Sequence, residues 1–132
     1  MAITFSVPGD PVPQPRPRVS TAGGFARAYV PASHAIHGYR QAVALAAKAA
    51  GLKEATAPVS VIVDAVFARP KSHLNKSGVK KSAPRLPRPD VDNIGKAVLD
   101  ALQEVMGDDA NVSRLVVEKT YGTEGRTTVR VT

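Results

Sequence analysis

The sequence predicts a single α+β domain over residues 1–132, with a mixed sheet and two main helices in the order β-α-β-α-β-β. A chain of 132 residues has the length of one domain. Segments with alternating apolar and polar side chains are interspersed with two segments whose apolar residues recur at helical spacing. Because cysteine is absent, the fold depends on an apolar core and not on disulfides or thiolate metal sites.

The first half predicts a strand, a stiff extended arm, a second short strand and a helix. Residues 3–7 alternate and predict the first strand, and five prolines within residues 8–17 stiffen the segment that follows. A glycine-containing turn then leads to a short strand over residues 25–30. Residues 33–50 carry apolar side chains at helical spacing, with a serine as the expected cap and Gly51 at the end.

The second half predicts a strand, a loop, a helix and a hairpin. Residues 59–67 are rich in β-branched side chains and alternate. Residues 69–89 are rich in proline, lysine and serine without periodicity, which is typical of a mobile basic loop. Residues 92–106 carry one apolar stripe and predict the clearest helix. Residues 115–121 and 127–131 are predicted to pair as a hairpin.

The charge pattern predicts a nucleic-acid partner. Eighteen lysines and arginines against eleven acids give a net charge of +7, which favours a polyanionic partner over a protein that is merely basic. No acid occurs from residue 11 to 53 or from 65 to 89. The candidate phosphate-binding residues are Arg16, Arg18, Arg69, Lys71, Lys76, Lys80, Lys81, Arg85 and Arg88.

Several other function classes are excluded. No apolar run approaches the ~20 residues that span a bilayer, and no signal peptide is evident, so we expect a cytoplasmic protein without a membrane partner. With aromatic residues at 5% and no tryptophan, a stacking platform for single-stranded bases is disfavoured. Residues 22–24 lack the Lys-Ser/Thr of a phosphate-binding loop, so no small-molecule cofactor is expected. His34 and His37 have no third metal ligand nearby.

Acidic residues gather in one segment. Six of the eleven acids lie between residues 90 and 109: Asp90, Asp92, Asp100, Glu104, Asp108 and Asp109. Carboxylates are hard oxygen ligands that suit Mg²⁺ or Mn²⁺, and such an ion beside a basic surface can promote phosphodiester hydrolysis. The alternative is that these acids are helix caps and an ordinary ion-pair ladder over Asp92, Lys96 and Asp100. The protein would then be a non-catalytic basic DNA-binding protein.

The segments RPDVDNIGKAVLDAL (residues 88–102) and GDDANV (107–112) resemble the signature of the RusA family of Holliday junction resolvases of phages and prophages. The opening VPGDP (7–11) and RPR (16–18) resemble the family's first strand and arm. The resemblance covers most of the chain. It implies a Mg²⁺-dependent endodeoxyribonuclease, an intertwined homodimer that cuts four-way DNA junctions with paired nicks. Activity on other branched DNA is the alternative.

The resemblance also assigns residues. It implies that Asp90, Asp92 and Asp109 are catalytic and hold one or two Mg²⁺, for which Mn²⁺ would substitute, and that Lys96 stabilises phosphate charge. The segment before the aspartate pair is shorter than in some members, so Asp108 remains an alternative metal ligand. Two further residues, Asn93 and Asp100, are expected to support the site.

A helix over residues 92–106 has a geometric consequence. At 1.5 Å per residue it is about 22 Å long, and Asp109 follows its end by three residues. Asp92 and Asp109 of one chain therefore cannot reach the same ion if the helix is unbroken. We expect Asp109 to complete the site of the partner subunit, which also fits a junction with two equivalent strands to cut.

Overall fold

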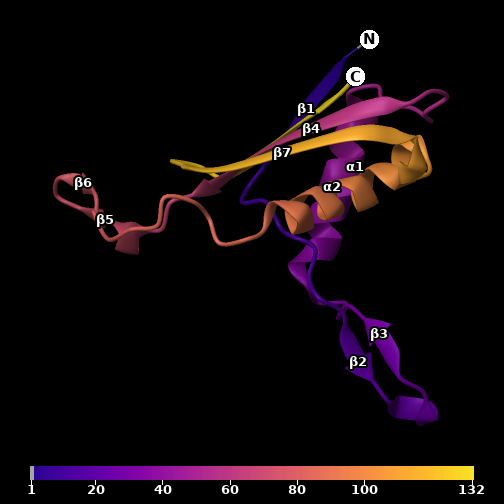
Figure 1. The fold of residues 1–132 in the computed structure, drawn as a ribbon, viewed down its shortest axis with the longest axis horizontal. Coiled ribbons are helices and arrows are strands. Elements are labelled where there is room, and N and C mark those ends of the chain that lie inside the picture. Colours follow the sequence, from indigo (N-terminus) through magenta and orange to yellow (C-terminus); the bar gives the residue numbers. More distant parts are fainter. Residues whose placement is uncertain (1) are drawn as a thin grey trace.

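The computed structural model describes residues 2–132, and a four-stranded mixed sheet forms its centre (Figure 1). The strands lie in the order β1-β8-β4-β7, where β4 is antiparallel to β8 and parallel to β7. Their bounds are Ile3–Pro8 for β1, Val59–Ala68 for β4, Val112–Gly122 for β7 and Arg126–Val131 for β8. The predicted α+β domain with a mixed sheet is confirmed.

Two helices cover one face of the sheet. They are α1 (Ala35–Ala49) and α2 (Val91–Met106), which lie on the same side in Figure 1. Alternate residues of β4 (Val61, Val63 and Ala65) are fully buried against them, as the alternating pattern of this strand predicts. Each helix contributes one apolar stripe, and the core consists of these two stripes together with buried side chains of β1, β4 and β8.

The start of α1 differs from its prediction. The cap is His34 and not Ser33: the His34 Nδ1 accepts the backbone N–H of Ile36 at 3.0 Å. An imidazole nitrogen can replace a hydroxyl here because a cap needs only an acceptor near the first free N–H groups. The helix then ends at Ala49, and Gly51 follows with φ 96°, a backbone conformation that glycine adopts without strain.

The predicted hairpin of β7 and β8 is wrong. These strands follow each other after a link of only three residues, yet β4 lies between them and hydrogen-bonds to both. The physical reason is that β4 is long and apolar, so the central position satisfies both of its edges. The link passes over the end of β4, where Arg69 donates its backbone N–H to the Gly122 carbonyl at 3.0 Å.

Two small hairpins project from the domain (Figure 1). One consists of β2 (Arg18–Ser20) and β3 (Arg27–Tyr29), of which the sequence predicted only the second strand. The other consists of β5 (Leu74–Asn75) and β6 (Gly78–Val79). The segment 69–89 is therefore not wholly irregular, because it also contains a 3-10 turn at Lys71–His73. Within residues 2–132, no helix has the length and apolarity to cross a bilayer.

One buried polar pair joins α1 to the sheet. The Tyr39 hydroxyl and the hydroxyl of Thr127 on β8 lie 2.7 Å apart, and Thr127 is fully buried. Burial raises the pKa of Tyr39 above its usual value of 10.0, and the hydrogen bond to Thr127 acts in the opposite direction. The pair therefore makes packing of α1 on β8 sensitive to alkaline pH.

Tyr39→Phe is predicted to lower the free energy of unfolding by about 1–3 kcal/mol, because it leaves the buried Thr127 hydroxyl without this partner. The raised folded-state pKa has a second effect. Stability from Tyr39 is complete below pH 10.0 and is lost as pH rises above it. Urea unfolding at neutral and alkaline pH should show a smaller alkaline loss in the variant. Tyr29→Phe, at an exposed position, is the control; equal behaviour of the two variants would contradict the prediction.

Candidate active site

The N-terminal end of α2 presents two carboxylates. Asp90 precedes the helix in an extended conformation and makes no side-chain capping hydrogen bond within the described residues. Among the described residues, the Asp92 Oδ1 accepts a local bond at 2.9 Å, from the backbone N–H of Asn93. Both aspartates are exposed. The interpretation of Asp90 as an ordinary side-chain cap is therefore not supported, and its oxygens are accessible to a ligand.

The solvent face of α2 continues from these aspartates. Lys96 is exposed one turn after Asp92, and Asp100 follows one turn later and is half-buried. The opposite face is held very close to β7, because a Cβ at Gly95 would lie 2.9 Å from the Val117 Cγ2. This close approach fixes the height of the helix above the sheet and hence the position of Lys96.

The C-terminal end of α2 carries the other aspartate pair. Gly107 ends the helix with φ 87°, which favours glycine. The Asp108 Oδ1 then accepts the backbone N–H of Ala110 at 3.0 Å and caps the 3-10 turn Asp109–Asn111. Asp109 is exposed in the first turn of that element. Within the described residues the two carboxylates thus differ, since that of Asp108 caps the 3-10 turn and that of Asp109 does not.

The helix keeps the two ends apart. Its 16 residues are uninterrupted and span about 24 Å. In the part of the chain that the structure describes, no three side chains of His, Cys, Asp or Glu come together in a way that could hold a metal ion. One chain therefore brings Asp90 and Asp92 to one end of α2 and Asp108 and Asp109 to the other.

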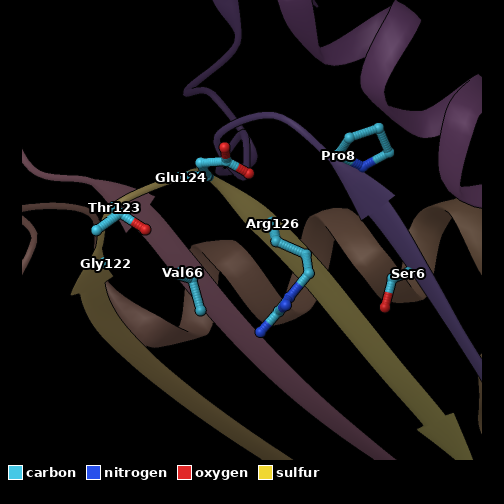
Figure 2. Close-up of a pocket in the computed structure, with 8 residues that line it drawn as sticks. Ser6, Pro8, Val66, Gly122, Thr123, Glu124 and Arg126 are labelled. Atoms are coloured by element: carbon cyan, nitrogen blue, oxygen red, sulfur yellow. The ribbon is translucent and has the colours of Figure 1, made fainter.

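A cavity of about 370 Å³ lies beside the segment that leads into α2. It lies between the end of the sheet and the segment 69–89 and is lined by residues that include Asp10, His73, Arg88, Pro89 and Tyr121. Pro89, the residue directly before Asp90, lines the cavity, whereas Asp90 and Asp92 do not. A second hollow, of about 420 Å³, lies on the open face of the sheet (Figure 2). None of the predicted site residues lines this second hollow.

The base of the segment 69–89 is attached to β7. The Arg69 guanidinium lies 4.2 Å from the centre of the Tyr121 ring, and its Nη1 donates to the Pro84 carbonyl at 3.0 Å. The His73 ring packs at right angles to the same Tyr121 ring, and the two ring centroids lie 5.6 Å apart. These contacts are of the cation–π and aromatic kinds that hold otherwise polar segments against a surface. They place the basic segment beside the cavity.

Comparison with known proteins places the chain in a family. The family described as endodeoxyribonuclease RusA matches residues 8–132, which include both helices and both aspartate pairs. The chain belongs to the RusA endodeoxyribonuclease family. It is also 37% identical over 136 aligned residues to YqaN of Bacillus subtilis (strain 168), which is described as uncharacterized, with 98% of this chain and 94% of that protein covered. The protein is thus an endodeoxyribonuclease.

Most of the predicted DNA-binding residues of this RusA-family protein are exposed, and most of these lie in the segment 69–89. Arg69 is half-buried and engaged with Tyr121, so it has a structural role besides its charge. The Arg18 side chain lies outside the described residues. The exposed members are Arg16, Lys71, Lys76, Lys80, Lys81, Arg85 and Arg88.

Sequence reasoning missed Lys119 of β7. Its Nζ donates to the Pro89 carbonyl at 2.8 Å, directly before Asp90. The hydrogen bond ties the approach to α2 to the end of the sheet and so helps to position the first aspartate pair. The strand itself was predicted, but this contact requires β7 to lie beside α2, and the sequence alone does not show that the two elements are neighbours.

Lys119→Met is predicted to lower the free energy of unfolding by about 1.5–3 kcal/mol, because a charge-assisted bond to a half-buried carbonyl is lost. It should also slow DNA cutting, since Asp90 is less well positioned. Chemical unfolding and a cleavage assay measure the two effects. Lys76→Met, at an exposed lysine in the turn between β5 and β6, is the stability control. A midpoint of unfolding equal to that of this control would refute the role of Lys119.

Proposed function

We propose that this protein is a homodimeric resolvase of four-way (Holliday) DNA junctions that cuts with paired nicks. Membership of the RusA endodeoxyribonuclease family is the observation that carries the proposal. Its net charge of +7 and the long acid-free segments support a polyanionic substrate. Two active sites related by a two-fold axis suit a junction whose strands are cut in symmetric pairs.

The carboxylates of Asp90, Asp92 and Asp109 suit Mg²⁺, with Mn²⁺ as a substitute. All three are exposed, and their oxygens are hard ligands of the kind that these ions prefer. Of the predicted site aspartates, all of them described, one chain brings Asp90 and Asp92 to the first end of α2 and Asp109 to the other, so the third carboxylate comes from Asp109 of a second copy. When bound there, the ion would activate water and neutralise charge on the scissile phosphate.

Asp109 is the better candidate for the third ligand than Asp108. The Asp108 carboxylate accepts the Ala110 N–H and caps the 3-10 turn. Moving it to an ion would cost that cap, which is typically worth about 1 kcal/mol. Asp109 has no such capping role in the described structure and is exposed.

Lys96 and the basic segment act on the phosphates. Lys96 lies one turn into α2 from Asp92 and can donate to the non-bridging oxygens as negative charge develops there. The exposed cations of segment 69–89 hold the backbone on either side, which gives affinity without sequence information. Asn93 and Asp100 support the site. The Asn93 carbonyl accepts the Gln14 N–H at 2.9 Å and so links the proline-rich arm to α2.

The first experiment is cleavage of a labelled synthetic four-way junction. Paired symmetric nicks in Mg²⁺ and none in EDTA are the expected result. Linear duplex, flap and fork substrates serve as controls, and equal cutting of flaps would make this a nuclease of other branched DNA. Binding without cutting in either Mg²⁺ or Mn²⁺ would favour the non-catalytic DNA-binding alternative.

Asp90→Asn is predicted to slow junction cutting by at least about 100-fold, since several kcal/mol of charge stabilisation depend on the ion that it helps to hold. Junction binding should stay the same or tighten, because one negative charge beside the DNA is removed. Gel-shift titration in EDTA and a single-turnover assay in Mg²⁺ measure these effects. A variant that cuts at the wild-type rate would end the proposed mechanism.

Mixed dimers test whether the site is shared between subunits. Asp90→Asn and Asp109→Asn homodimers should both be inactive. A purified heterodimer of the two variants has one site with both native aspartates if the site is shared, and it should nick the junction on one strand. If each chain supplied its whole site, this heterodimer would lack an intact site and would not cut. Differently tagged, co-expressed subunits allow the heterodimer to be isolated.

A further inference from the structure

The hairpin of β2 and β3 projects away from the sheet and helices (Figure 1). Its apolar side chains are unusually exposed. Phe25 is 71% exposed, Val19 is 69% exposed and Tyr29 is 45% exposed. Phe25 lies in the turn between the two strands, at the far end of the hairpin. A two-stranded hairpin with so little buried surface is marginally stable alone, so this arm has the character of a binding element.

The arm is strongly basic. No acidic residue occurs between residues 11 and 53, whereas Arg16, Arg18 and Arg27 belong to the arm or its stem. In the strand register, Arg27 pairs with Ser20, and Tyr29 pairs with Arg18. Arg27 and Tyr29 are two residues apart on β3, and alternate residues of a strand share one face of the hairpin. The arm therefore combines positive charge and aromatic groups, which is the composition that binds nucleic acid.

The stem ties the arm to the active-site end of α2. The Gln14 N–H donates to the Asn93 carbonyl at 2.9 Å, one residue after Asp92. Prolines at positions 13, 15 and 17 on one side and Pro31 on the other restrict the backbone of the stem. From Gln14 to Thr21, at the start of the turn, the chain can extend over at most about 25 Å. That is about seven nucleotides of one strand at 3.4 Å each.

We propose that this arm is a second DNA-binding element, in which Phe25 stacks on unpaired or unstacked bases at the branch point while Arg27 contacts the adjacent backbone. The proposal rests on branched DNA as the substrate and adds to it the element that senses the branch. A duplex interior offers no free base face, whereas the centre of a junction does. A single phenyl ring can stack on one base, which differs from the platform of several aromatic residues that the low aromatic content disfavours.

Charge favours DNA over a second copy as the occupant of the arm. Each copy carries a net charge of +7, so an arm without acids would approach a partner that repels it. The phosphate backbone attracts the same arginines and supplies bases for Phe25. Contact with a second copy becomes an outcome of the test.

The test compares Phe25→Ala with the parent protein, both in the Asp90→Asn background and in EDTA so that no cutting occurs. Stacking on a base, as measured by alanine substitution, predicts about 5- to 150-fold weaker binding of a four-way junction. Binding of linear duplex should change less than about twofold. With 2-aminopurine at the branch point, binding of the parent should change the 2-aminopurine fluorescence, and binding of Phe25→Ala should not. Phe25→Trp should keep both the junction affinity and the fluorescence change of the parent.

Leu45→Ala is the matched control, since Leu45 on α1 is 66% exposed and lies outside the arm. It should bind the junction like the parent. Equal junction affinity and fluorescence for Phe25→Ala and the parent would overturn the proposal and leave the nuclease function standing. Dissociation of the dimer by Phe25→Ala, seen by sedimentation, would overturn it in favour of a second copy. Failure of the parent to prefer junction over duplex would overturn the proposed substrate as well.

Discussion

The unbroken helix α2 is the constraint on which the candidate active site depends. It holds Asp90 and Asp92 at its start and Asp109 just past its end, and its 16 residues keep these groups about 24 Å apart. A helix cannot shorten without losing backbone hydrogen bonds, so no side-chain movement closes this gap. For a metal site that needs all three carboxylates, the chain must therefore meet a second copy with α2 in the opposite direction.

The sheet gives this helix a fixed position. The contact of Gly95 with Val117 and Leu115 of β7 lets the helix lie close to the strand, and a larger side chain would force one of them to move. Lys119, farther along the same strand, holds the Pro89 carbonyl just before the helix. Two contacts with β7, one at Gly95 and one at the Pro89 carbonyl, thus position the N-terminal aspartate pair. This arrangement is possible because β7 occupies the sheet edge beside β4 and not a hairpin with β8.

The difference between local and non-local information explains what the sequence could predict. The strand β4 and both helices were found because their apolar periodicity is contained within each segment. The neighbours of β7 in the sheet were not predicted, because the short, glycine-bounded link to β8 has the form of a hairpin turn. In the structure β4 pairs with both β7 and β8, and this pairing excludes the hairpin. Similarly, Asp90 was found from its motif, whereas Lys119 becomes significant only once β7 lies next to Pro89.

The same distinction applies to the two basic projections. Their charge is evident in the sequence, but the contacts that orient them are not: Arg69 against Tyr121 for one, and Gln14 against Asn93 for the other. Both attachments lie near the first aspartate pair. Phosphates drawn to either projection are therefore brought toward carboxylates that would repel them without a counter-ion. Under the proposed metal mechanism, DNA binding and metal binding would be coupled, because each would reduce the electrostatic cost of the other.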